Sequence, residues 1–276
     1  MNTKCFLCNS DNHKVLHKGV RDNECIDVLK CSECSLEFLS DFSHINKSFY
    51  EKGLMHNKEI DKWIKNTYCD DFRRFKFLEQ KIQGKKVLDF GCGNGGFVKL
   101  AQCDGVEIDE SMKEYFDVNG LCVYSSIDNL KQAYDYITLF HVVEHLKNPI
   151  EILNGLKSKL AKDGRLIIEV PNCNDALISL YKSKSFEDFT YWSCHLFNYN
   201  ECTLSKVLEK SGYRVIKTEF IQRYPYTNHL YWFFKKSPAG HEKLKHLYCR
   251  ALNDLYCSFL KRFKITDTLI VEAEKV

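Results

Sequence analysis

Residues 87–96 read Val-Leu-Asp-Phe-Gly-Cys-Gly-Asn-Gly-Gly, a short apolar segment that runs directly into a glycine-rich stretch. An apolar segment of this length, closed by glycines, predicts a buried strand followed by a tight turn. Glycine also lets a ligand come close to the backbone, so the turn is a candidate binding site. The spacing Gly91-x-Gly93-x-x-Gly96 matches the dinucleotide fingerprint as well, and by itself it does not decide which ligand binds.

Two acidic residues narrow the choice of ligand. Asp89 ends the strand before the turn, where a carboxylate would repel a pyrophosphate but suits an ammonium group. Glu107 ends the next predicted strand, 104–108, where an acid can accept hydrogen bonds from both ribose hydroxyls. A ribose with an amino-acid tail and no phosphate describes S-adenosylmethionine. A nicotinamide or flavin nucleotide and a ligand-free structural turn are the alternatives.

Strands and helices alternate along the rest of the chain. Alternation of this kind predicts a parallel sheet with helices on both faces, the α/β doubly wound class. The expected helices cover about 58–82, 149–161 and 201–211. The expected strands are 85–90, 104–108, 121–124, 134–142, 165–170, 213–219 and a last one at 268–273.

Residues 87–96, 105–109, 134–145 and 164–172 resemble successive motifs of the class I S-adenosylmethionine-dependent methyltransferases. The resemblance implies a Rossmann-like, seven-stranded sheet, S-adenosylmethionine as cofactor and methyl transfer as the reaction. It also implies which residues border the cofactor: Asp89, Gly91, Cys92, Gly93, Glu107, Ile108, Ser126, Ile127, Phe140 and His141.

The N-terminus carries two Cys-x-x-Cys pairs, Cys5/Cys8 and Cys31/Cys34. Two such turns can deliver four thiolates to one tetrahedral Zn²⁺, which leaves no position for water and makes the zinc structural. A segment of about 40 residues has too small a core to fold alone, so the metal would supply folding energy. Four free thiols, a redox pair and an iron–sulfur cluster are the alternatives.

Three residues are candidates for chemistry at the acceptor: His195, Tyr191 and His145. His195 follows the fifth strand of the main sheet, at the carboxyl edge where the acceptor should meet the methyl group, and a histidine titrates near neutral pH. A structural histidine is the alternative. Glu144 and His145 resemble part of a Mg²⁺-binding pattern in some O-methyltransferases, with a capping pair as the alternative; Tyr191 is a helper.

A long insert, about 221–263, interrupts the last part of the sheet. Leu244, Leu247, Ala251, Leu255 and Phe259 predict one amphipathic helix within it. Residues 223–234 are strongly aromatic and are a candidate platform for a sugar ring or a base. The alternatives are packing inside the insert or a surface between two copies of the chain in a homodimer.

The sequence therefore predicts a zinc ribbon at 1–40, a helical linker or lid at 41–83 and a methyltransferase domain at 84–276. A net charge of +3 over 276 residues argues against a nucleic-acid partner. No signal-peptide h-region or apolar span stands out, so we expect a cytoplasmic protein away from the membrane.

The expected acceptor is a hydroxyl of a sugar or nucleotide-linked sugar in glycan or secondary-metabolite biosynthesis, because the ribbon and domain together resemble bacterial sugar methyltransferases. The alternatives are an RNA methyltransferase with the ribbon as its grip and a non-catalytic S-adenosylmethionine-binding protein.

Overall fold

A seven-stranded sheet forms the centre of the molecule. The computed structural model describes residues 4–45 and 60–276. The strands stand in the order β10-β11-β8-β7-β4-β5-β6. Their bounds are β4 (Val87–Phe90), β5 (Asp104–Val106), β6 (Val123–Tyr124), β7 (Tyr134–Phe140), β8 (Leu160–Pro171), β10 (Tyr213–Ile221) and β11 (Thr268–Lys275).

Strands β4 to β8 pair in parallel, and β11 inserts antiparallel between β8 and β10. This is the Rossmann-like order expected from the sequence, including the return of the last strand to the sheet, so the predicted fold class is confirmed.

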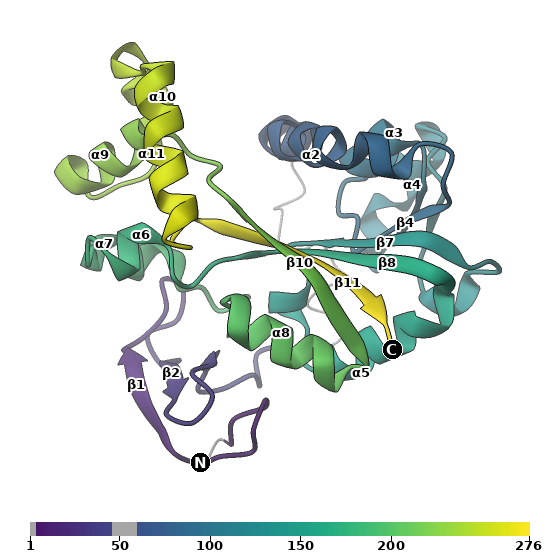
Figure 1. Cartoon of the computed structure of the whole chain (residues 1–276), viewed down its shortest axis with the longest axis horizontal. Coiled ribbons are helices and arrows are strands. Elements are labelled where there is room, and N and C mark those ends of the chain that lie inside the picture. Colours follow the sequence, from purple (N-terminus) through teal and green to yellow (C-terminus); the bar gives the residue numbers. More distant parts are fainter. Residues whose placement is uncertain (1–3, 46–59) are drawn as a thin grey trace.

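Helices cover both faces of the sheet (Figure 1). Helices α2 (Ile60–Ile82) and α3 (Gly96–Ala101) lie on one face, and α5 (Pro149–Leu156) and α8 (Glu201–Lys210) lie on the other. The shorter helices are α4 (Lys113–Val118), α6 (Ala176–Ser179) and α7 (Lys184–Thr190), and the 3-10 turns are η1 (Glu110–Met112), η2 (Ile127–Asn129), η3 (Val143–His145) and η4 (Lys157–Lys159). No helix in residues 4–45 and 60–276 is both long and apolar enough to span a bilayer.

Several predicted boundaries are wrong. The strand expected at 104–108 stops at Val106, so Glu107 begins the loop instead of ending the strand. The strands expected at 121–124 and 134–142 are shortened to β6 and β7. Strand β8 starts at Leu160, five residues before the predicted start, because Leu160 pairs with Tyr134 across an irregularity in the ladder. The helix expected to reach 161 ends at Leu156, and residues 58 and 59 of the first predicted helix lie outside the described residues.

The insert holds three helices where one was predicted: α9 (Tyr226–Lys235), α10 (Gly240–Lys243) and α11 (Arg250–Arg262), with the turn η5 (Lys245–Leu247) between the last two. The hydroxyl of Tyr226 donates to the carbonyl of Leu247 and accepts from the N–H of Cys249, so it bonds to both sides of the break. Leu244 and Leu247 therefore precede the helix that the periodicity assigned them to.

The N-terminal segment carries strands β1 (His13–His17), β2 (Val28–Cys31) and β3 (Glu37–Leu39). Strand β9 (Phe197–Asn198), which follows the His195 loop, extends this small sheet by pairing with β3. Buried residues of the segment and of the α5/α8 side of the large sheet also form one continuous hydrophobic cluster. The N-terminal segment is thus packed into the rest of the molecule through both backbone and core, and the division at residues 40 and 83 stays a prediction.

Candidate functional site

The turn after β4 has the backbone that glycine permits. Gly91, Gly93 and Gly95 have φ values of 72°, 56° and 73°, in the left-handed region that other residues adopt reluctantly. A Cβ on Gly91 would lie 2.6 Å from Cγ2 of Val142, so this position also has no room for a side chain. The backbone of the turn therefore packs against Val142 on one side, and a ligand can approach it from the other.

Glu107 lies directly against this turn. Its Oε2 accepts the N–H of Gly93 at 2.8 Å, and its Oε1 accepts the N–H groups of Ile108 and Asp109 at 2.8 and 3.0 Å. Burial raises the pKa of Glu107, although these N–H groups favour the ionised form. Oε1 already accepts two hydrogen bonds, whereas Oε2 accepts one and keeps a second lone pair. The side chain can hold the turn and still accept a hydrogen bond from a ligand.

Asp89, the third residue of β4, is almost fully buried and accepts a hydrogen bond from the Thr138 hydroxyl at 2.7 Å. Burial raises its pKa to about 7. A carboxyl group in this position is stabilised in its charged form by a cation placed beside it, because a nearby opposite charge lowers the pKa.

These residues line one large cavity of about 760 Å³. Its wall includes eight of the ten predicted cofactor residues; Ser126 and Ile127 lie outside it. Five carboxylates and three fixed cations also line it: Asp70, Asp71, Asp89, Glu107 and Asp109 against Lys62, Arg74 and Arg223. The excess of carboxylates suits a cationic ligand better than a phosphate.

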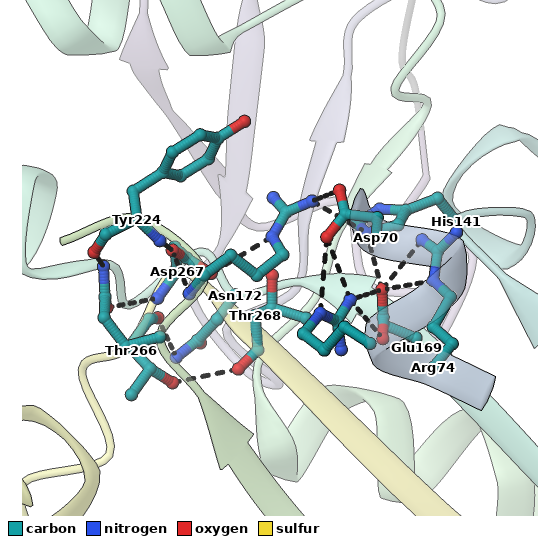
Figure 2. A network of polar contacts seen from close by, with 12 residues as sticks. Asp70, Arg74, His141, Glu169, Asn172, Tyr224, Thr266, Asp267 and Thr268 are labelled. Atoms are coloured by element: carbon teal, nitrogen blue, oxygen red, sulfur yellow. Dashed lines mark hydrogen bonds and ion pairs between the residues drawn. The ribbon is translucent and has the colours of Figure 1, made fainter. Parts of the chain in front are cut away.

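Helix α2 supplies much of the wall, through Trp63, Thr67, Asp70 and Arg74 among others. It is fastened to the sheet by buried Glu169 of β8, whose Oε1 accepts from Arg74 Nε and Nη2 at 3.0 and 2.8 Å and from Arg73 at 2.9 Å (Figure 2). The sequence predicts a helical linker or lid here but does not single out the residues that fasten it to the sheet. The two acidic and two basic residues close together at 70–74 are the sequence feature that could have indicated them.

Arg223 connects the insert to the same network. Its Nη1 lies 3.3 Å from Asp70 Oδ2, and its backbone N–H and Nε donate to Asp267 at 2.9 and 3.3 Å (Figure 2). In the sequence, Arg223 stands out only as the first residue of the aromatic stretch 223–234. Its place in the cavity wall could not be predicted, because it depends on contacts with residues far away in the chain.

His141 bridges two carboxylates at the carboxyl end of β7. Its Nδ1 donates to Glu144 Oε1 at 3.0 Å and its Nε2 lies 3.2 Å from Glu169 Oε1. Burial alone would lower the pKa of His141, but the two carboxylates outweigh it and the pKa is raised. His141 has a φ of 56° and lines the large cavity.

The structure places His145 and His195 on the wall of the large cavity, and Tyr191 on the wall of a smaller cavity that His195 also lines. His145 and His195 both line the large cavity, and their rings lie 5.0 Å apart. Burial lowers the pKa of both, that of His195 to about 3. Tyr191 is 2 % exposed, packs on His17 and lies outside the wall of the large cavity.

Glu144 completes a cluster with these two histidines. One ligand atom from each of Glu144, His145 and His195 lies within 4.8 Å of the others. Burial raises the pKa of Glu144, but the hydrogen bond and charge of His141 and the charges of His145 and His195 hold it at about 2.

A second cavity, about 240 Å³, adjoins the first through Pro171, His195 and Arg223, which line both. Its wall combines aromatic rings with polar groups: Phe186, Phe189, Trp232, Tyr224, Asn172, Asp175 and Asn228. Part of the predicted aromatic platform therefore faces a cavity, whereas Phe233 and Phe234 are exposed on α9.

The four predicted zinc ligands converge. Sγ of Cys5 lies 3.4 Å from Sγ of Cys34, and Sγ of Cys8 lies 3.4 Å from Sγ of Cys31. Four sulfurs around a tetrahedral Zn²⁺ at about 2.3 Å lie about 3.8 Å apart, close to this spacing. Each Cys-x-x-Cys turn is followed by a left-handed residue, Asn9 or Ser35. The sulfurs fit a tetrahedral metal site.

Comparison with known proteins assigns the chain to a protein family. A profile described as a methyltransferase domain matches residues 60–218, more than half of the chain. A solved S-adenosylmethionine-dependent methyltransferase from Archaeoglobus fulgidus superposes with a TM-score of 0.51 at 24% identity, covering 74% of this chain and 92% of that one. At this identity the superposition shows the fold.

Two curated relatives have different acceptors in their names. The ubiquinone biosynthesis O-methyltransferase of Haemophilus ducreyi is 27% identical over 36% of this chain and 52% of its own length. The tRNA U34 carboxymethyltransferase of Campylobacter lari is 28% identical over 46% of this chain and 51% of its own length. The chain spans about half the length of the curated relatives it matches.

Proposed function

The chain belongs to the methyltransferase-domain family, and from that premise we propose that it transfers the methyl group of S-adenosylmethionine to a hydroxyl of a small, sugar-containing acceptor. The observation that carries the reaction is that Asp89, the glycine turn and Glu107 line the same cavity as His145 and His195. One ligand can span the first group and present its reactive atom to the second.

The cofactor would lie with its amino-acid end at Asp89 and its ribose at Glu107. Asp89 offers a buried carboxylate to the ammonium, and Glu107 offers the remaining lone pair of Oε2 to the ribose hydroxyls. Gly91 and Gly93 line the same cavity, where they present backbone without a side chain. The acidic excess of the wall also favours the sulfonium cation.

Methyl transfer from a sulfonium is an in-line displacement. An oxygen lone pair of the acceptor forms the new O–CH₃ bond while the S–CH₃ bond breaks, and its electron pair stays on sulfur. The acceptor hydroxyl gives its proton to the imidazole of His195, which acts as the general base, and the products are the methyl ether and neutral S-adenosylhomocysteine. Much of the acceleration can come from holding the oxygen behind the methyl carbon.

The second cavity supports a sugar-like acceptor. Aromatic rings such as Trp232 and Tyr224 can stack on the apolar face of a ring, while Asp175 and Asn228 offer acceptors and donors for hydroxyls. His195 lies where this cavity joins the cofactor cavity. An acceptor bound here would meet the methyl group beside His195.

The N-terminal cysteines would bind a structural zinc and make residues 1–40 a zinc ribbon. When bound, the metal would join the turn at Cys5–Cys8 to the end of β2 at Cys31 and to the turn that carries Cys34. Thiolates of this kind persist in a reducing compartment such as the cytoplasm, which is the location we propose.

The test is turnover of methyl-labelled S-adenosylmethionine with separate panels of free sugars, nucleotide sugars, phenols and short RNAs, with products identified by mass spectrometry. Label in a sugar or nucleotide sugar is the expected result. Label in phenols or RNA alone would overturn the acceptor class, and absence of S-adenosylhomocysteine binding in calorimetry would overturn the reaction.

A further inference from the structure

We propose that Glu144, His145 and His195 bind a divalent transition-metal ion at the acceptor end of the cavity. The three side chains come from η3 and from the loop before β9, two segments about 50 residues apart in the sequence. One atom of each lies within 4.8 Å of the others. Ligands around an ion at about 2.1 Å lie about 3 to 3.5 Å apart, so binding would draw these atoms together by about 1 Å.

The orientation of His145 favours a ligand role. Its Nδ1 lies 2.7 Å from the backbone carbonyl oxygen of Cys194, and a carbonyl only accepts, so Nδ1 carries the proton. The lone pair is then on Nε2, which lies 4.0 Å from Oε1 of Glu144. Histidines that bind metals are held in this way, with the second ring nitrogen donating to a carbonyl or carboxylate.

Glu144 gives an independent observation. Its side chain is 1 % exposed, and its Oε2 has no hydrogen-bond partner in the part of the chain that the structure describes. A buried carboxylate oxygen without a partner is costly. Its Oε1 accepts from His141, which is the support that metal-binding carboxylates usually have. A cation beside Oε2 would satisfy the oxygen and balance its charge.

The composition of the cluster indicates the kind of metal. Two imidazoles and one carboxylate suit Zn²⁺, Fe²⁺ and related ions, whereas the thiolates near the N-terminus select zinc more narrowly. Three protein ligands leave positions open on the ion, and His145 and His195 both line the cavity. When bound, the ion would polarise the acceptor hydroxyl.

Polarisation of the acceptor hydroxyl by the ion rests on the proposed function, whereas the metal site itself rests on the geometry. Metal binding would also change the role of His195. As a ligand, this histidine lends its lone pair to the ion, so it would position the hydroxyl through the metal instead of removing its proton as a general base.

The experiment uses Co²⁺ as the probe on the full chain with one zinc per chain already bound. Co²⁺ held by nitrogen and oxygen shows weak visible bands, while Co²⁺ held by thiolates adds intense charge-transfer bands in the near ultraviolet. Equilibrium dialysis gives the stoichiometry. We expect one Co²⁺ per chain with visible bands and without the thiolate bands.

Glu144→Gln and His195→Gln should each weaken Co²⁺ binding by at least about tenfold, one lost ligand being worth about 1.4 kcal/mol or more. His246→Gln, at an exposed histidine of η5, is the matched control and should bind as the wild type does. Thermal unfolding of each variant shows whether it is folded, and the wild-type spectrum tests the site without any variant.

Absence of the visible bands in the wild type would overturn the site, as would wild-type affinity in both ligand variants. Calorimetry with S-adenosylhomocysteine is run in parallel without Co²⁺. Cofactor binding without Co²⁺ binding would reject the metal alone, and Co²⁺ binding without cofactor binding would reject the proposed function alone.

Discussion

At the scale of single residues, Glu107 holds the glycine turn and also faces the proposed ribose position. Glu107→Gln replaces one acceptor oxygen with an NH₂ group and removes the charge. We expect S-adenosylhomocysteine affinity to fall about tenfold, since a hydrogen bond to a charged group contributes about 1.5–3 kcal/mol. Isothermal titration measures this. Glu110→Gln, at an exposed neighbour, should change nothing; equal affinity in the two variants would refute the ribose assignment.

Asp89 predicts a pH dependence of cofactor binding. Its pKa is raised to about 7 by burial, so the side chain is mostly protonated below that pH and cannot pair with an ammonium group. Affinity for S-adenosylmethionine should therefore rise with pH through about 7, by up to about tenfold per pH unit on the acid side. Titrations at about pH 6 and pH 8 test this, and Asp89→Asn should flatten the dependence. The same slope in the variant would assign it to another group.

At the scale of elements, α2 is a wall of the cavity that depends on buried charge. Arg74→Met removes one contact of this helix with Glu169 of β8, and the pair with Asp71 within the helix, but keeps most of the side-chain volume. We expect the free energy of unfolding to fall by about 3 kcal/mol, the low end for a broken buried pair, because Arg73 and His141 still contact Glu169. Urea unfolding measures it.

Lys76→Met on the same helix is the control for this change. Lys76 is about half exposed and pairs with exposed Glu79, so its loss should cost well under 1 kcal/mol. Equal losses in the two variants would mean that the buried network does not fasten α2 to the sheet.

The sequence predicted elements well where their signal was local. The glycine turn after β4 and the start of α8 at Glu201, which Asn200 caps, are set by neighbouring residues, and both are where the sequence places them. The break between η5 and α11, at Leu247–Cys249, is held by the hydroxyl of Tyr226, more than twenty residues away. The local hydrophobic periodicity contains no sign of this contact, so it predicts one continuous helix. The positions of Arg223 and Glu169 in the site depend in the same way on contacts between distant segments.

At the scale of the whole molecule, the N-terminal segment supports the loop that carries His195. The N–H of Leu39 donates to the carbonyl of Leu196 at 3.1 Å, and Ser193 donates to Asp22 through its N–H and its hydroxyl at 3.0 and 2.6 Å. Arg21 stacks over Trp192 at 4.6 Å from the ring centroid. The loop has contacts with this segment on both sides of His195, so the conformation of the segment should determine where the acceptor site lies.

Loss of the zinc proposed for the N-terminal cysteines should therefore damage the proposed acceptor site far more than the cofactor site. We expect Cys8→Ser to lower methyl transfer by about 10²-fold, because displacing a reacting group by about 1 Å can cost that much. S-adenosylhomocysteine affinity should change little, since Glu107 and the glycine turn are held by β4, β5 and each other. Hydrogen exchange should rise in residues 191–199 and stay constant in 87–109. Cys25→Ser, at an exposed cysteine outside the cluster, is the matched control. If zinc is lost and exchange rises equally in both segments, the N-terminal segment stabilises the whole fold and does not act through the loop; if exchange rises in neither, the loop holds its place without the metal.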